Sequence, residues 1–335
     1  MPRQHTLPHH IPHPFPHRIP RPFPHPSPHP SPRRGTAVLA ALGVATTILA
    51  SCSTAPEPSE PTPEAAGASA APATPLTTAP ASALPPSACR DDQPGRYVEE
   101  IFTPAPVSTT EYTAGLKADV YAPADDPAAC RVGVVWVHGG GFTQFDRTGQ
   151  AEQAWGAALA ARGYVAIQID YRLGDGGGFI LETANDPSRA AVVDNAIEDA
   201  RTAIDWVRTS ATDLGVDPQR VAIGGTSAGA MTAAGAALTA TADSRPCTLV
   251  SISGAIKDEW VGTDPGSGLF IHGDADDVVP YDSSVSAVDE INKAGGTATL
   301  HTIAGAGHEL TGVPKPEVVA AAAGWLREHA AARCG

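Results

Sequence analysis

The sequence predicts an α/β protein with a mostly parallel, eight-stranded sheet covered by helices on both faces and without a large cap domain. Apolar runs such as Val132–Val137 are continuous rather than alternating, which is typical of strands buried on both faces. Segments with apolar residues at helical spacing separate these runs. About 245 residues follow Cys89, a length that suits one large domain.

Eight segments have strand patterns. The first two, Tyr97–Thr103 and Leu116–Tyr121, alternate well enough to be edge strands, with a turn near Gly115. The other six are apolar or β-branched runs, which cover Val132–Val137, Tyr164–Asp170, a run from Val221, Leu249–Ser253, Leu269–His272 and Thr297–Ile303. Asp217-Pro218 predicts a turn before the run from Val221.

Five helices are predicted between the strands, and reactive groups are therefore expected at the carboxyl ends of the strands. Trp155 and Leu159 share one side of the first helix, and Gly163 ends it. The predicted helices cover Gln150–Arg162, Pro187–Thr209, the segment after Ser227, Ser283–Lys293 and Pro316–Ala331. The Gly-rich segment Gly174–Asn185 is expected to be irregular.

The first 88 residues are expected to lie outside the fold. Residues 1–34 form a Pro/His-rich leader, and the apolar run Gly35–Ser51 after Arg33-Arg34 predicts a secretory signal. Residues 53–88 are Ala, Pro, Thr and Ser with almost no large apolar side chain, so they predict a disordered linker. The expected organisation is therefore leader and signal in 1–52, linker in 53–88 and a catalytic domain in 89–335.

The end of the apolar run, Leu49-Ala50-Ser51-Cys52, resembles the lipobox of bacterial lipoproteins. That resemblance implies cleavage before Cys52 and lipidation of its thiol, which would make the chain a cell-envelope lipoprotein with a tether. An ordinary secreted protein is the alternative. Membrane contact is expected only through this anchor.

Export would place the remaining cysteines, Cys89, Cys130, Cys247 and Cys334, in an oxidising compartment. An even set there predicts two disulfides, with three connectivities open. The favoured pairs are Cys89 with Cys130, at the start of the domain, and Cys247 with Cys334, at the last helix.

The chain has 36 acidic and 22 basic side chains, a formal charge of −14. The first 52 residues hold five arginines and no acid, so the exported part would carry −19. Such a charge argues against nucleic acid as a partner.

Gly225-Thr226-Ser227-Ala228-Gly229 follows an apolar strand and precedes an Ala-rich helix, which is the pattern of a nucleophile elbow. A serine at its ordinary pKa needs a base within hydrogen-bond reach. His308 is the favoured base, because Gly305–Glu309 reads as a flexible loop after the last strand, and His272 is its main competitor. An acid that orients the histidine is expected among Asp274, Asp276 and Asp277, which follow another strand.

Together with His138-Gly139-Gly140-Gly141 after a buried strand, these motifs resemble the carboxylesterase and lipase group of α/β-hydrolases, from about Tyr112 onward. The resemblance of His272–Pro280 to that superfamily's His-Gly-x-x-Asp-x-x-Val-Pro element implies Asp276 as the acid. It also implies oxyanion donors at the backbone N–H groups of Gly140, Gly141 and Ala228. Tyr171-Arg172 and Asp199 resemble the same group.

Thr226 departs from the hormone-sensitive-lipase-like members, which usually have an acid there, and their N-terminal helical cap has no counterpart. The only candidate lids are Gly174–Asn185 and Lys257–Ser267, so an open or shallow site is expected. The candidates for its aromatic walls are Phe142, Trp260 and Tyr281, and each of them would fit the core equally well.

The predicted function is a serine carboxylic-ester hydrolase that acts on small or polymeric esters, with short-chain or acetyl groups favoured, and needs no cofactor or metal. Two alternatives remain open. One is a peptidase resembling the prolyl oligopeptidase group, and the other is a non-catalytic binding module on a hydrolase fold. The sequence leaves the oligomeric state unknown.

Overall fold

The computed structural model describes residues 93–175 and 187–331, which belong to one compact unit. The predicted leader, signal and linker lie outside the described residues, and so do Cys52, Cys89 and Cys334. No helix in the described ranges is long and apolar enough to cross a membrane.

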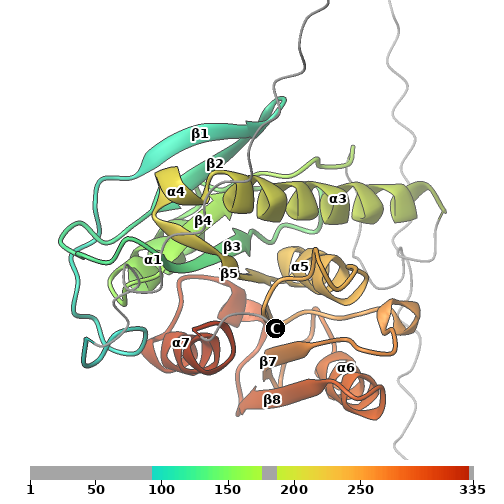
Figure 1. Ribbon diagram of the computed structural model, residues 1–335. Coiled ribbons are helices and arrows are strands. Elements are labelled where there is room, and N and C mark those ends of the chain that lie inside the picture. Colours follow the sequence, from blue (N-terminus) through green and yellow to red (C-terminus); the bar gives the residue numbers. More distant parts are fainter. Residues whose placement is uncertain (1–92, 176–186, 332–335) are drawn as a thin grey trace, which may run out of the picture. The chain divides into compact units, whose positions relative to one another are not determined.

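The sheet has eight strands in the order β1-β2-β4-β3-β5-β6-β7-β8 (Figure 1). β2 pairs antiparallel with both β1 and β4, and all other neighbours are parallel. This arrangement confirms the predicted α/β class. The strands are β1 Ser108–Thr113, β2 Leu116–Tyr121, β3 Arg131–Val137, β4 Val165–Ile169, β5 Val216–Thr226, β6 Leu249–Ile252, β7 Ser267–Gly273 and β8 Thr297–Ile303.

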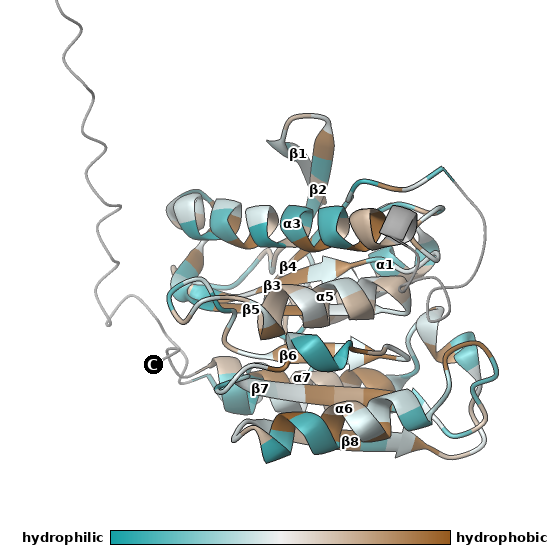
Figure 2. Ribbon diagram, turned by 90° about the vertical axis from the view of Figure 1, so that its right-hand side faces the viewer, coloured by the Kyte–Doolittle hydropathy of each residue, from teal (hydrophilic) through white to brown (hydrophobic). Residues whose placement is uncertain are grey.

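Helices cover both faces of the sheet. Helices α3, α5 and α6 pack on one face, where Ile204 and Met231 meet Val135, and they lie in front of the sheet in Figure 2. Helices α1 and α7 pack on the other face, where Trp155 stacks on Trp136 at 4.3 Å. The helices are α1 Gln150–Ala160, α3 Pro187–Thr209, α4 Ala211–Leu214, α5 Ala228–Leu238, α6 Asp282–Lys293 and α7 Pro316–Ala330, with short 3-10 turns η2 Asp258–Trp260 and η3 His308–Thr311.

The first edge strand was placed wrongly by the sequence pattern. Tyr97–Thr103 is a turn followed by irregular chain, because Tyr97 has φ 69° and is buried against Tyr164, while the Arg96 guanidinium pairs with Asp126. The true first strand, β1, is largely exposed and buries only Tyr112. An edge strand with so little apolar content carries almost no period-2 signal.

The predicted turn at Asp217-Pro218 falls inside β5 instead. The ladder to β3 is irregular there, since Arg131 pairs with Val216 and Gly133 already pairs with Val221. The Asp217 carboxylate accepts a hydrogen bond from the Gln219 N–H at 3.0 Å. The turn-forming residues therefore produce a bulge within the strand rather than its beginning.

The described residues contain no separate cap domain over the carboxyl ends of the strands. Of the two candidate lids, Lys257–Ser267 includes the short turn η2, and Gly174–Asn185 lies mostly outside the described residues.

Candidate active site

Ser227 stands between β5 and α5 in a strained backbone conformation, with φ 53° and ψ −121°. The glycines beside it are required by close backbone packing. A Cβ at Gly225 would lie 2.6 Å from the backbone of Gly229, and a Cβ at Gly229 would lie 2.1 Å from the Val137 oxygen. The turn therefore has the geometry of a nucleophile elbow, with Ser227 at its tip and at the N-terminal end of α5.

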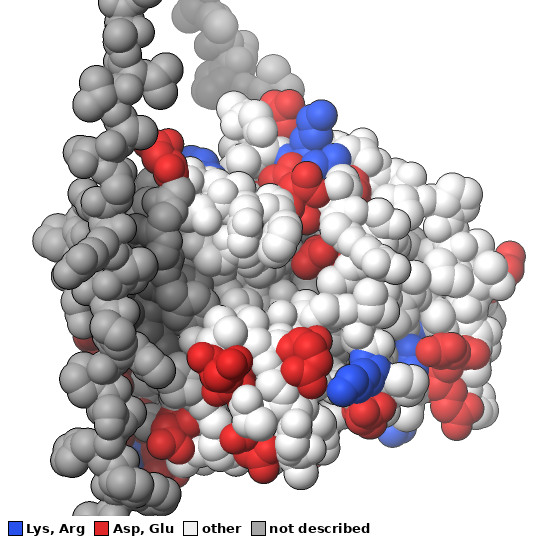
Figure 3. Space-filling view, turned by 180° about the vertical axis from the view of Figure 1, so that it is seen from behind, with Lys and Arg blue, Asp and Glu red and all other residues white. Residues whose placement is uncertain are grey.

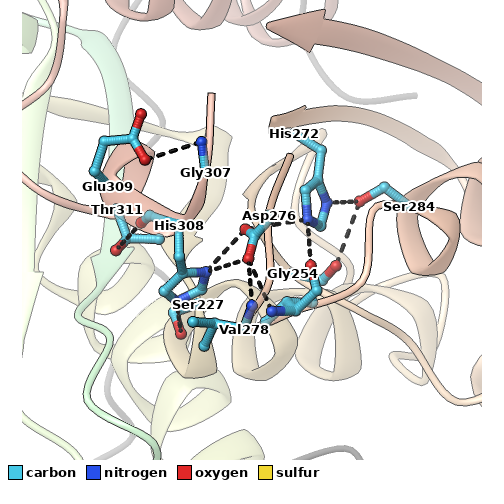
Figure 4. A network of polar contacts seen from close by, with 11 residues as sticks. Ser227, Gly254, His272, Asp276, Val278, Ser284, Gly307, His308, Glu309 and Thr311 are labelled. Carbon is cyan, nitrogen blue, oxygen red and sulfur yellow. Dashed lines mark hydrogen bonds and ion pairs between the residues drawn. The ribbon is translucent and has the colours of Figure 1, made fainter. Parts of the chain in front are cut away.

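His308, the first residue of η3, lies directly over the serine (Figure 4). Its Nε2 is 3.0 Å from the Ser227 Oγ, and its Nδ1 is 2.9 Å from Oδ2 of Asp276. The turn is held locally, because the Thr311 hydroxyl donates to the His308 carbonyl at 2.8 Å. The structure thus brings together the predicted serine, histidine and acid from three separate segments.

Asp276 is an ionised acid whose carboxylate is held in place by backbone hydrogen bonds. Its Oδ1 accepts hydrogen bonds from the N–H groups of Val278 at 3.0 Å and Val279 at 2.9 Å. Burial by itself raises the pKa of Asp276. The hydrogen bonds from His308 and from these two amides lower the pKa by more than burial raises it, so the pKa of Asp276 lies below its usual value. A carboxylate in this state can hold the His308 tautomer and stabilise an imidazolium.

The other candidates for the base and the acid, which are His272, Asp274 and Asp277, do not contact Ser227 or His308 in this way. His272 is fully buried, with Nδ1 2.7 Å from the Ser284 hydroxyl and Nε2 3.0 Å from the Val279 carbonyl. Burial lowers its pKa, and its Nε2 is 3.4 Å from Asp276, so His272 supports the acid from behind (Figure 4). Asp277 is exposed, and Asp274 accepts from the Gly305 N–H at 2.6 Å in the loop that leads to His308.

The glycine loop after β3 lies against the elbow. A Cβ at Gly139 would be 3.3 Å from the Ser227 Cβ, and Gly140 and Gly141 have φ of 106° and 61°. His138 stacks on Tyr171, whose hydroxyl donates to the His138 carbonyl at 3.1 Å. Within the described chain, the N–H groups of Gly140, Gly141 and Ala228 donate to no backbone or side-chain acceptor.

Arg147 anchors the far end of the same loop. Its guanidinium bonds Asp119 at 3.0 Å and Asp170 at 2.7 Å, and its backbone N–H donates to Asp170 at 3.1 Å. Between the glycines and Arg147, Phe142 and Phe145 both have positive φ. Such strain in bulky residues persists only where the surroundings fix the backbone.

Ser227 and His308 open into a cavity of about 730 Å³. The predicted aromatic walls Phe142, Trp260 and Tyr281 are not among its lining residues, since the first two are buried in the core and Tyr281 bonds Thr302 in β8. The lining residues are Gly139, Gly140, Gly141, Thr143, Gln144, Phe145, Gly149, Gln150, Ala151, Glu152, Thr226, Ser227, Val278, His308, Thr311 and Gly312.

The sequence reasoning missed the wall residues Glu152, Phe145 and Val278. Glu152 occupies the first turn of α1, where an acid is expected for the helix alone. The exposure of Phe145, at 67%, depends on a loop conformation that no periodicity encodes. Thr226 lines the cavity as well, and its buried hydroxyl has no partner among the described atoms.

Cys130 and Cys247 are each disulfide-bonded. Their predicted partners, Cys89 and Cys334, lie outside the described residues, so the pairing stays a prediction. In the described ranges no three His, Cys, Asp or Glu side chains are placed to hold a metal ion. On the face drawn in Figure 3, acidic side chains predominate over basic ones.

Two family models match parts of the chain, BD-FAE over residues 118–247 and "alpha/beta hydrolase fold" over residues 190–332. The para-nitrobenzyl esterase of Bacillus subtilis (strain 168) is 36% identical over 121 residues, which are 36% of this chain and 23% of the relative. The liver carboxylesterase of Sus scrofa is 34% identical over 152 residues, which are 44% of this chain and 25% of the relative. The chain thus spans about a quarter of the length of these curated relatives.

Two solved structures are similar over a larger part of the chain. Thermogutta terrifontis esterase 2 phosphorylated by paraoxon matches with a TM-score of 0.54 and 25% identity, over 66% of this chain and 94% of that one. A truncated carbohydrate esterase from gut microbiota matches with a TM-score of 0.58 and 20% identity, over 71% and 99%. With the strand order and the elbow described above, these matches show that the chain has the α/β-hydrolase fold.

Proposed function

We propose that the chain is a serine carboxylic-ester hydrolase that works through an acyl-enzyme on Ser227. The observation that carries the proposal is the hydrogen-bonded series from the Ser227 Oγ through His308 to Asp276, of which Ser227 and His308 line the cavity. The relatives and neighbours named as esterases support the same reaction class.

In the acylation half, His308 Nε2 takes the proton of the Ser227 hydroxyl while the Oγ attacks the carbonyl carbon of the ester. The carbonyl oxygen becomes an oxyanion, and the free N–H groups of Gly140, Gly141 and Ala228 are its proposed donors. When the tetrahedral intermediate collapses, the bond to the alcohol oxygen breaks. The leaving alkoxide receives the proton from His308, and the acyl group stays on Ser227.

In the deacylation half, His308 takes a proton from a water molecule, whose oxygen attacks the acyl carbon. The same oxyanion donors serve again, the bond to the Ser227 Oγ breaks, and that Oγ recovers its proton from His308. Asp276 remains ionised throughout, because its role is to orient the imidazole and stabilise its charged form. Short-chain or acetyl esters are the proposed substrates, since the described residues hold no large lid over the cavity.

The proposal is tested with p-nitrophenyl acetate, butyrate, octanoate and palmitate on the full chain and on Ser227→Ala and His308→Ala. Both variants should lose about three orders of magnitude or more in kcat, because removal of either member disables the unit. Activity should be highest on acetate or butyrate. Ser286→Ala and His301→Ala, at exposed positions on α6 and β8, are the matched controls and should keep wild-type rates.

A second readout does not depend on finding the right ester. Paraoxon should transfer one diethylphosphoryl group to the wild-type chain and none to Ser227→Ala, as seen by intact mass. Wild-type chain that is folded, unlabelled by paraoxon and inactive on every ester would contradict the proposal and favour a binding module.

We also propose export and anchoring through Cys52, supported by the sequence of the signal segment. Acyl chains on Cys52 would hold the chain in the membrane fraction, because each buried methylene contributes about 0.8 kcal/mol. Cys52→Ser, expressed in a bacterium with lipoprotein processing, should shift the chain from the detergent phase to the aqueous phase on Triton X-114 partition. Ser53→Ala is the control and should leave the chain in the detergent phase. If Cys52→Ser and Ser53→Ala divide between the two phases in the same way, the proposed anchor at Cys52 is contradicted.

A further inference from the structure

Glu152 is a buried acid in the wall of the Ser227 cavity. It is the third residue of α1, its exposed fraction is 7%, and it lines the same cavity as Ser227 and His308. Its carboxylate lies against Gly149, where an added Cβ would be 2.2 Å from Oε2. The carboxyl group is therefore packed between the helix start and the cavity.

The other buried acids of the described chain bond to groups on other residues, and Glu152 does not. Three of them bond to arginines, Asp276 bonds to His308, and Asp217 accepts a hydrogen bond from the Gln219 N–H. Asp126 pairs with Arg96 and Asp199 pairs with Arg172. Glu152 has no ion pair and no side-chain hydrogen bond to another described residue, and its carboxyl accepts a hydrogen bond only from its own backbone N–H. Burial, with the Asp146 charge as a smaller cause, raises the pKa of Glu152 above its usual value.

A purely structural role does not need this burial. An acid in the first turn of a helix interacts favourably with the helix dipole, and Glu317 lies in the first turn of α7 with its side chain exposed to solvent. Burying a carboxyl without a partner costs free energy, so a residue held in this way is a candidate for contact with a ligand.

The chemistry of the cavity indicates what that ligand is. The same lining includes the side chains of Thr143, Gln144 and Thr311, which are neutral hydrogen-bonding groups, and His308 is the only basic side chain among the lining residues. A carboxyl group in either protonation state can accept a hydrogen bond from a hydroxyl. A second carboxylate placed in the same cavity would be repelled.

We propose that Glu152 is a specificity-determining residue, which binds a hydroxyl group of a neutral ester at Ser227 and disfavours esters that carry a carboxylate. This inference rests on the proposed esterase function. It assigns the substrate class as uncharged hydroxy esters.

The test compares kcat/KM within two pairs of esters of similar size, on the full chain. Glycerol monoacetate and propyl acetate differ in hydroxyl groups, and monoethyl succinate and ethyl butyrate differ in a carboxylate. The first ratio is kcat/KM for glycerol monoacetate divided by that for propyl acetate, and the second is kcat/KM for monoethyl succinate divided by that for ethyl butyrate. Glu152→Ala should lower the first ratio by about tenfold and raise the second by about tenfold, the size of one lost polar contact. Glu152→Gln, whose amide still accepts a hydrogen bond, should raise the second ratio and lower the first by less.

Glu317→Gln removes a carboxylate from the first turn of another helix, outside the cavity, and both ratios should stay at their wild-type values. Unchanged ratios in folded Glu152→Gln and Glu152→Ala, with p-nitrophenyl acetate still hydrolysed by the wild type, would overturn the role of Glu152 and leave the esterase proposal intact. If Glu152→Ala does not fold, the role of Glu152 is judged from the second ratio in Glu152→Gln.

Acetylcholine tests whether Glu152 binds a cation instead of a hydroxyl group. If Glu152→Gln lowers kcat/KM for acetylcholine more than it lowers kcat/KM for glycerol monoacetate, the assignment to a hydroxyl is overturned. A wild-type chain that neither hydrolyses esters nor reacts with paraoxon would overturn both proposals.

Discussion

At the scale of single residues, Asp276 has more support than contact with His308 alone requires. Two backbone amides hold its Oδ1, while His272 lies behind its Oδ2 and is itself fixed by the Ser284 hydroxyl (Figure 4). These contacts leave the carboxylate one orientation, which faces Nδ1 of His308. The orientation of the imidazole is therefore set by groups that lie three contacts away from Ser227, beyond His308 and Asp276.

Asp276→Asn should lower kcat by roughly 10⁴, because an amide can keep the packing but favours the wrong His308 tautomer. The measurement is kcat on p-nitrophenyl acetate. Asp277→Asn removes the neighbouring exposed carboxylate and is the matched control, with kcat expected near wild type. Similar losses in both variants would mean that general charge near the loop, rather than the Asp276 contact, governs the rate.

Residue patterns in the sequence could predict the elbow serine, the loop histidine and three candidate acids, since each follows a strand and has a local signature. They could not choose by themselves among Asp274, Asp276 and Asp277, because the choice depends on which carboxylate reaches His308. Glu152 and Phe145 had no signature at all. Their importance comes from burial and from a strained loop, and both are properties of the folded chain.

At the scale of elements, the buried strands were predictable because parallel strands covered on both faces are continuous apolar runs. The exceptions are instructive. β1 is polar and pairs with β2 through a hairpin at Gly115, so its register depends on the turn rather than on burial. β5 begins earlier than its apolar run, because Val216 still pairs with Arg131 before the bulge that contains Asp217. Neither feature places a residue of the Ser227 site, which explains why the site was easier to predict than the sheet edge.

At the scale of the whole molecule, the segment before β1 is attached to the domain by charge as well as by packing. Asp126 is buried between the guanidinium groups of Arg96 and Arg131, with Nη1 of Arg96 at 2.9 Å and Nε of Arg131 at 2.7 Å. The Asp126 side chain is fully buried, and Arg96 also lies over the Phe102 ring. One carboxylate thus ties the chain near Arg96 to the beginning of β3.

Asp126→Asn should lower the free energy of unfolding at pH 7 by about 3 kcal/mol, because it leaves two arginines without their buried counter-charge. The difference should depend on pH. Burial by itself raises the pKa of Asp126, but hydrogen bonds from Arg96, Ala128 and Arg131 lower it more, so the folded pKa lies below the unfolded value. The stabilisation by the carboxylate is therefore complete above the unfolded pKa, near 4, and is lost as the pH falls through the folded pKa.

Urea unfolding followed by tryptophan fluorescence at pH 7, 5, 4 and 3 measures this directly. The gap between wild type and Asp126→Asn should be widest at pH 7 and should narrow below pH 4, as the wild-type carboxyl becomes protonated. Asp125→Asn changes the adjacent exposed carboxylate and should follow the wild type at every pH. A gap that stays constant down to pH 3 would mean that Asp126 stabilises the domain through its shape and neutral hydrogen bonds, and that its charge contributes little to holding the segment before β1.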